Sequence, residues 1–399
     1  MTMTRLLLIG LLLFGLNING FAQQDQYNHE FLAVKKRFSD IEADALAEAF
    51  NGISTSEGKT ANLFKIQSTG VSTAPIVAAA DAYLHLLSTP ELIRTQFAVD
   101  DPEWRRWFNV DNGIYVRQGL SLKEMSSAQR KAAINLVKTS LSAKGFRLTQ
   151  SIMKTDRTLS ELNGHGFLDE DLYFLTIMGV PDEKEPWGWQ LDGHHLVINY
   201  FILGDQVVMT PTFLGAEPAV ATSGKYAGNT VLQEEQNKGL AFMQSLASEQ
   251  QKIATLKARK LTDNMEAAAH KDNLVLDYAG VQASQLSESH KQMLLALIDL
   301  YVANMKEGHA KIRMDEVREY LDETWFAWVG DVKNDSVFYY RIHSPVILIE
   351  FDHQVPVGTE MLHENGVPTR DHIHVVIRTP NGNDYGKDLL GQHLKTHKH

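Results

Sequence analysis

The stretch DHIHVVIR, residues 371–378, alternates polar and apolar residues with a period of two. This pattern predicts a β-strand, because successive side chains of a strand point to opposite faces of the sheet. One face is apolar and suits a hydrophobic core; it comprises Ile373, Val375 and Ile377. The other face carries His372 and His374, which a rise of about 3.3 Å per residue separates by about 7 Å. Two imidazoles this close can bind one metal ion.

The preceding segment VILIEFDH, residues 346–353, predicts a second strand, in which Glu350 and Asp352 share a face. A carboxylate among aliphatic side chains is costly to bury unless it is paired or binds a metal. If this strand lies beside the first, Glu350 faces the two histidines. Two His and one carboxylate form the ligand set of catalytic zinc and non-haem iron sites. We therefore expect His372, His374 and Glu350 to bind one divalent ion; the alternative is that the histidines line a solvated sheet face.

A second pair of histidines, His194 and His195, lies in DGHHLVIN, residues 192–199. If this segment is a strand, its adjacent residues point to opposite faces, so only one of the two can join a common site. Strand parity does not choose between them, although Asn199 makes the face of His195 the more polar. We expect His195 or His194 to be a further metal ligand.

Two acidic residues and one arginine are candidates for work beside the metal. Asp352 or Glu217 could orient a water molecule, and Glu217 could instead be a fourth ligand. Arg378 lies on the histidine face of its strand, where it could bind a substrate charge or pair with Asp352. The alternative for Glu217 is a solvated loop position.

The stretch NGNDYG, residues 381–386, is rich in turn-forming residues and predicts a loop after the histidine strand. Asp384 is a candidate acceptor for a ligand histidine, and Tyr385 is a candidate acid or base at the mouth of the site. The simpler alternative is that both residues only build the loop.

Helical and strand-like patterns come in blocks rather than in βαβ alternation. Helical periodicity marks residues 29–150 and 234–325, and strand-like patterns mark residues 171–213 and 336–379. Blocks of this kind favour an α+β fold, with helices packed on an antiparallel sheet. We expect the two strand-rich blocks to join in one sheet, which would bring the GHH and HIH motifs together.

Local signals predict where some of these elements begin and end. Ser121 and Glu124 match a capping box, which predicts a helix start, and Lys144-Gly145 predicts its end. Residues 187–213 predict a hairpin whose turn is Gly204-Asp205. Trp325 and Trp328 stand at helical spacing.

The first residues, MTMTRLLLIGLLLFGLNINGFAQQDQ, combine one Arg, a short apolar run and a small-residue site that ends at Ala22. This is typical of a secretory signal peptide over residues 1–22, and predicts an exported mature protein, periplasmic or secreted, that is not held in a membrane. The chain has no Cys, so no disulfide can form. Its net charge of −11 without a basic run argues against nucleic acid as a partner.

Several motifs together resemble a known family, the domain-of-unknown-function family number 3500. They are, in chain order, EWRRWFN, VRQGLSL, GWQLDGHHLVIN, TPTFLGAEPA, LIEFDHQ and HIHVVIRTPNGNDYG. The resemblance implies a single family domain over residues 23–399 and an exported protein, and it carries over no activity and no cofactor.

We therefore expect an exported metal-dependent enzyme, a hydrolase that uses zinc and acts on a small molecule, sugar or peptide. One alternative is an oxidoreductase that binds iron or copper at the same ligands. The other is a non-catalytic ligand- or metal-binding protein, in which Trp187 and Trp189 form an aromatic platform in a pocket.

Overall fold

The computed structural model describes residues 32–396, and within them one large sheet organises the fold. The signal-peptide prediction for residues 1–22 lies outside this range. The main strand order is β1-β3-β4-β5-β7-β13-β12-β11-β10-β8, while β2 pairs with β3, β6 with β5 and β9 with β10. Most neighbours are antiparallel, and β1–β3 and β8–β10 are parallel. The predicted α+β class and the joining of the two strand-rich blocks are confirmed.

The strands have these bounds: β1 Gln96–Phe97, β2 Leu120–Ser121, β3 Phe174–Met178, β4 Trp187–Gly193, β5 Leu196–Leu203, β6 Gln206–Val208, β7 Thr212–Ala216, β8 Thr255–Lys257, β9 Val281–Gln282, β10 Trp325–Gly330, β11 Phe338–His343, β12 Leu348–His353 and β13 Ile373–Arg378. The α-helices are a first helix over residues 32–47, then α2 Ala74–Leu84, α3 Thr89–Thr95, α4 Ser127–Ser140, α5 Ala143–Asn163, α6 Gln233–Ser245, α7 Ser248–Ala254, α8 Glu288–Val302, α9 Glu307–Glu319 and α10 Lys387–Thr396. Short 3₁₀ turns are η1 Pro102–Arg105, η2 Ala283–Gln285, η3 Leu321–Glu323, η4 Glu360–Leu362 and η5 Asp384–Gly386.

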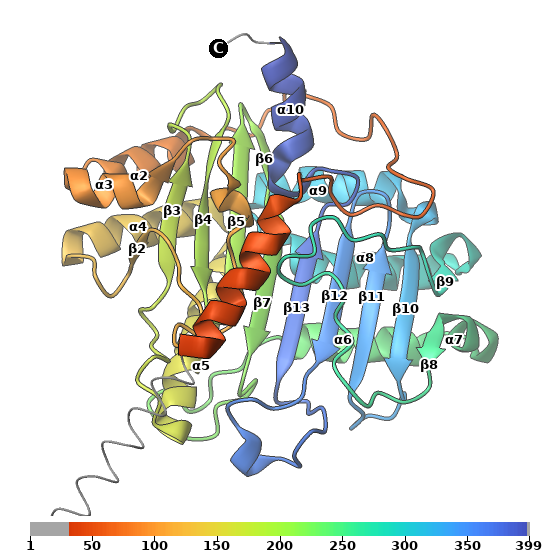
Figure 1. Cartoon of the computed structure of the whole chain (residues 1–399). Helices are drawn as coiled ribbons and strands as arrows, with labels where there is room; N and C mark the ends of the chain where they lie inside the picture. Colours follow the sequence, from red (N-terminus) through yellow and green to blue (C-terminus); the bar gives the residue numbers. More distant parts are fainter. Residues whose placement is uncertain (1–31, 397–399) are drawn as a thin grey trace, which may run out of the picture.

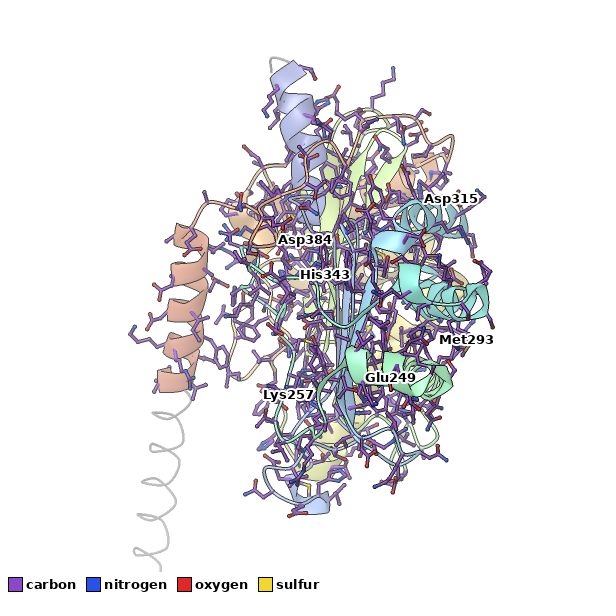
Figure 2. The ribbon with its side chains drawn as sticks, turned by 90° about the vertical axis from the view of Figure 1, so that its right-hand side faces the viewer. Glu249, Lys257, Met293, Asp315, His343 and Asp384 are labelled. Carbon is purple, nitrogen blue, oxygen red and sulfur yellow. The ribbon has the colours of Figure 1, made fainter. Side chains whose placement is uncertain are left out.

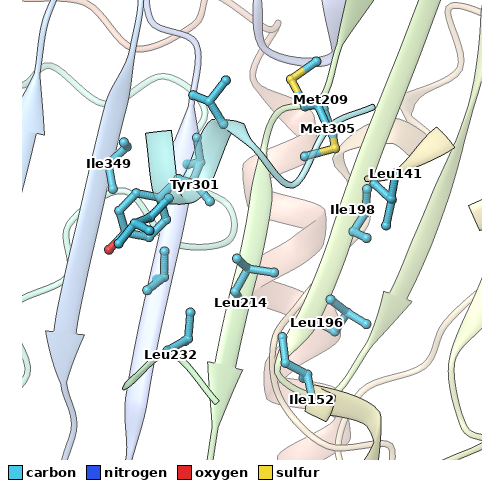
Figure 3. Close-up of a cluster of buried hydrophobic side chains, with 14 of the residues drawn as sticks. Leu141, Ile152, Leu196, Ile198, Met209, Leu214, Leu232, Tyr301, Met305 and Ile349 are labelled. Atoms are coloured by element: carbon cyan, nitrogen blue, oxygen red, sulfur yellow. The ribbon is translucent and has the colours of Figure 1, made fainter. Parts of the chain in front are cut away.

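Helices cover one face of the sheet, behind it in Figure 1, and make the larger core with it. This core takes one side of the central strands; Leu196, Ile198, Leu214 and Ile349 lie in it with Ile152 from α5 and Tyr301 from α8 (Figure 3). In β13, Ile373, Val375 and Ile377 belong to it, as the period-two pattern predicts.

The opposite face is covered mainly by extended chain and by the helix over residues 32–47, which lies at the left in Figure 2. A second core forms there, with Trp104, Trp107, Phe213, Val376 and Tyr385. Both faces of the sheet are therefore buried, which explains why strands such as β5 and β11 are buried along their whole length.

Two predicted helix boundaries are wrong. Ser121 does bond Glu124, but in the turn after β2; helix α4 starts later, where Ser126 and Gln129 form the capping box. Lys144-Gly145 lies inside α5, because Ser142 caps a new helix there, and the αL residue Gly164 ends it. The helix start that the sequence predicted is therefore five residues too early.

Two further corrections concern strands. Residues 234–325 are not helical throughout, since extended chain separates α7 from α8, and Trp325 and Trp328 lie on β10. The turn at Gly204-Asp205 is present between β5 and β6, but a second turn at His194-His195 divides β4 from β5. The GHH motif is thus a hairpin turn and not part of a continuous strand.

The two-sided burial of the sheet predicts a large stability cost for truncation in β12. Ile349 is fully buried in the helix-side core, so Ile349→Ala should lower the free energy of unfolding by about 2–5 kcal/mol. Ile93→Ala on α3, where the side chain is 73% exposed, should change it by less than about 0.5 kcal/mol. Urea unfolding followed by tryptophan fluorescence measures both; equal effects would contradict the assignment of the core.

Candidate metal centre

Three imidazoles converge on one point at the edge of β5, β7 and β13. The Nε2 atom of His195 lies 3.1 Å from that of His374 and 3.3 Å from that of His372, and the last two are 3.0 Å apart. Three nitrogen ligands about 2.0–2.1 Å from a tetrahedral ion stand about 3.3 Å from one another. The three nitrogens therefore already have nearly the spacing of ligands around one ion.

The backbone explains why the motifs meet. His195 is the second residue of the β4–β5 turn and adopts φ 58°, a left-handed conformation that directs it away from the strand ladder. Strand β7 pairs with β5 on one side and with β13 on the other, so that Gly215 lies opposite His374 and its N–H donates to the carbonyl of His195. The expected proximity of the GHH and HIH motifs is thus present, through the intervening strand β7.

Gly215 leaves the space that the rings occupy. A Cβ atom at this position would lie 2.9 Å from Cδ2 of His195 and 3.1 Å from Cδ2 of His374. Both rings cross the backbone of β7 at a place where any side chain would displace them. Gly193, the glycine of the GHH motif, instead makes room for the ring of Tyr173.

Hydrogen bonding fixes the tautomer of His372. His372 Nδ1 lies 2.8 Å from the carbonyl oxygen of Val355, which can only accept, so Nδ1–H donates and Nε2 presents a lone pair. Burial, followed by the neighbouring imidazoles, lowers the pKa of His195 and His374 well below its usual value. Neutral imidazoles are the metal-binding form.

The other turn residue, His194, makes a second polar pair beside the three histidines. Its ring stacks on His195 with centroids 3.9 Å apart, and its Nδ1 lies 2.6 Å from Asp156 of α5. The hydroxyl of Tyr173 donates to the other carboxylate oxygen. Burial lowers the pKa of His194, but the charge of Asp156 and the hydrogen bond to it together bring the pKa above its usual value. His194 therefore does not point to the opposite face, as strand parity predicted, because a turn breaks the alternation.

The histidines open onto a pocket of about 270 Å³. Its walls come from residues 109–114, from the end of α5 and the chain after it, and from the loop that joins β12 to β13. That loop lies beyond the ends of β12 and β13 in Figure 1, and Asn163 of α5 donates to its Gly358. The three-histidine centre is therefore reachable from solvent through a cavity.

Glu217 holds this loop in place. One carboxylate oxygen accepts hydrogen bonds from the backbone N–H of Val357, Gly358 and Thr359 and from the Thr359 hydroxyl, at 2.7–3.0 Å. The other lies 3.6 Å from His372 Nδ1. Burial raises the pKa of Glu217, but the charge of His372 and these bonds lower it below its usual value. Glu217 thus lines the site and orients His372 and the loop; its oxygens do not join the three converging nitrogens.

The structure does not bring Glu350 to the histidines. Its neighbour across the β12–β13 ladder is Val376, and its carboxylate accepts bonds from Ala267 N at 2.7 Å and from the Tyr339 hydroxyl at 2.6 Å. Glu350 therefore does not join the converging nitrogens, all three of which belong to histidines. The register decides this, because the residue opposite His374 is Asp352.

Asp352 forms a buried ion pair. Its carboxylate lies 2.5 Å from Lys260 Nζ and accepts from the backbone N–H of Asn264 at 2.7 Å. The segment after β8 supplies both partners and covers this part of the sheet. The expected water-orienting role of Asp352 has no geometry to support it.

Arg378, Asp384 and Tyr385 are also structural rather than part of this pocket. The guanidinium lies 2.7 Å from Asp272 and 3.1 Å from Asp384, and Tyr385 donates to Asp272 at 3.0 Å. All three side chains are fully buried. Asp384 therefore bonds no ligand histidine, and Arg378 is not free to bind substrate.

The aromatic platform suggested for Trp187 and Trp189 is also wrong. Both side chains are completely buried, and Trp189 stacks on Tyr200 with ring centroids 5.1 Å apart. They fill the helix-side core, where no ligand can reach them.

Sequence reasoning missed Asp156, Tyr173 and Gly215. Asp156 lies in a helix with ordinary amphipathic patterning, so no local signal marks it. Gly215 lies just beyond the predicted strand block, which ends at residue 213; within a strand, a glycine often indicates close approach of other groups.

Residues 69–387 match the family model described as Protein of unknown function (DUF3500). The chain therefore belongs to this family, and the matched residues include the β-sheet and all three histidines. No curated protein and no solved structure matches the chain. Among residues 32–396, none of the helices has the length and apolar character needed to cross a bilayer.

Gly215 provides a direct test of how the rings are positioned. Gly215→Ala should displace His195 and His374 and weaken metal binding by about 10–100-fold, the usual effect of disturbing the support of a ligand. Gly391→Ala on α10, where an added Cβ meets nothing within 4 Å, should leave metal affinity unchanged. Competition with a chromogenic chelator measures both affinities; an unaltered affinity in Gly215→Ala would contradict this role.

Proposed function

We propose that this protein is an exported metal-dependent enzyme that binds one divalent ion, zinc in the first instance, through His195, His372 and His374, and that it catalyses a hydrolysis. The observation that carries the proposal is the convergence of three Nε2 atoms within 3.0–3.3 Å of one another. Export rests on the signal-peptide pattern of residues 1–22.

Three imidazole nitrogens facing one another are hard to explain without a cation. Because His372 donates from Nδ1, its Nε2 is an acceptor, and at most a single shared proton could bridge any two of the rings. A metal ion would satisfy all three lone pairs at once. The cavity adds to this argument, because catalytic zinc sites use three protein ligands and keep one position open.

An ion held by these three histidines would act as a Lewis acid and would lower the pKa of a bound water towards about 7. His194 is the residue best placed to exchange a proton with a group in the cavity, since Asp156 orients its ring and it lines the pocket beside His195. It takes the role that the sequence suggested for Asp352 or Glu217. The same three nitrogens also suit copper or iron, so metal identity decides between hydrolysis and oxidation.

Metal analysis of the purified mature chain tests the site. The wild type should hold one ion per chain by mass spectrometry, directly or after reconstitution with zinc. The His372→Ala/His374→Ala double variant should hold none, because it loses two of three ligands. His85→Ala, at an exposed position on the helical side of the fold, is the matched control and should keep the ion.

A wild-type protein that takes up no stoichiometric zinc, copper or iron would overturn the proposal. Stoichiometric copper or iron in place of zinc would favour the oxidoreductase, and a bound ion without turnover on a broad substrate panel would favour the binding protein.

The Asp156–His194 pair predicts a separate effect on turnover. In zinc-loaded protein, Asp156→Asn should lower kcat for hydrolysis of p-nitrophenyl acetate by about 10²-fold, because the His194 ring loses its charged partner, while zinc stoichiometry stays the same. Asp299→Asn on the exposed face of α8 should change neither quantity. An unchanged kcat in Asp156→Asn would show that His194 takes no part in the reaction.

A further inference from the structure

The walls of the pocket indicate what kind of group it can accept beside the three histidines. Apolar side chains from three separate segments face it: Val110, Ile114, Leu159, Phe167, Leu168 and Val357. Leu159 and Leu168 are buried at its base, whereas Val357 is 70% exposed at the loop. Apolar walls around a few polar groups are typical of sites for small organic ligands.

The charges that line the pocket are acidic apart from His194, whose pKa is raised and whose ring is already paired with the carboxylate of Asp156. Among the described residues that line it there is no Lys or Arg, while Asp111 and Glu217 contribute two carboxylates. Arg378, which the sequence offered as an anion clamp, is buried in its own ion pairs. An ion of charge +2 held by three neutral imidazoles would be offset by these two carboxylates, so the cavity as a whole offers an anion no surplus of positive charge.

The size of the pocket limits how large a bound group can be. Pockets for drug-sized ligands measure about 300–1,000 Å³, and this one is about 270 Å³. Packing against the β12–β13 loop limits it further, since a Cβ on Gly358 would lie 2.9 Å from Leu159. There is room for one compact group next to the histidines, not for an oligosaccharide or a folded peptide segment.

We infer that the substrate is an uncharged carbonyl compound, an ester, amide or lactone, that carries one compact hydrocarbon group, and that the wall around Phe167 binds this group. The inference rests on the proposed metal-dependent hydrolase and defines its substrate class. The carbonyl would lie towards the three histidines, and the hydrocarbon group would lie between the end of α5 and the loop. Phosphate esters and acidic sugars are excluded from this class, because the described lining offers them no Lys or Arg and its His194 is already paired with Asp156.

Hydroxamic acids test the inference, since they bind zinc through the same two oxygens whatever group they carry. Calorimetry on the zinc-loaded mature protein would compare benzohydroxamic, acetohydroxamic and 4-carboxybenzohydroxamic acid. The benzo compound should bind at least about 10-fold more tightly than either of the others, because its ring gains apolar contacts and carries no charge.

Two variants test whether the apolar wall around Phe167 causes the preference for benzohydroxamic acid. Phe167→Ala should weaken binding of the benzo compound several-fold and leave acetohydroxamate and zinc binding unchanged, because the benzene ring would reach this side chain and the methyl group of acetohydroxamate would not. Val180→Ala, which removes an exposed side chain outside the pocket, should alter neither compound. A loss of acetohydroxamate binding in Phe167→Ala would indicate a distorted centre and would count against the wall as a separate subsite.

The outcomes separate this inference from the proposed function. A wild-type protein that takes up no stoichiometric zinc, copper or iron overturns both. If the protein binds zinc, three results would overturn the substrate class and leave the metal centre unaffected. They are equal affinity for the three hydroxamates, tighter binding of the carboxylated compound, and no binding of any hydroxamate.

Discussion

The pairing of β7 with both β5 and β13 is the constraint on which the candidate site depends. Backbone hydrogen bonds fix these three strands side by side, so that the β4–β5 turn and the start of β13 lie on either side of Gly215. His195 comes almost 180 residues before its partners, and only this ladder brings the nitrogens to within 3.3 Å. A shift of the register by one residue would turn His374 to the helix-covered face.

Burial of both sheet faces accounts for what the remaining charged residues do. A buried charge must be paired or hydrogen-bonded, and the segment after β8, with η5, supplies partners for Glu350, Asp352 and Arg378. These residues hold the covering segments on the sheet, and their charged groups are already paired, so they are not available to a ligand. The histidines at the edge of this cover are different, because the cavity of about 270 Å³ reaches them.

Much of the fold could be predicted from the sequence, and the errors of that prediction have a common cause. The period-two pattern of residues 372–378 gave the strand and its two faces correctly, because alternation is a local property. The same rule was wrong for His194 and His195, where a two-residue turn interrupts the strand and stacks both rings on one side. The choice of Glu350 as a ligand was wrong because cross-strand register is decided by pairing, which a single strand does not encode.

The sequence by itself determined the class of fold, the strand that carries His372 and His374, and the family to which the chain belongs. The tertiary structure alone decided that His195 joins these two histidines and that Asp156 of α5 supports His194. It also decided which carboxylates are hydrogen-bonded inside the core. The physical reason is the range of the interactions. Alternation, caps and turns act over a few residues, whereas a site made of a turn, a strand and a helix exists only after long-range pairing has fixed their positions.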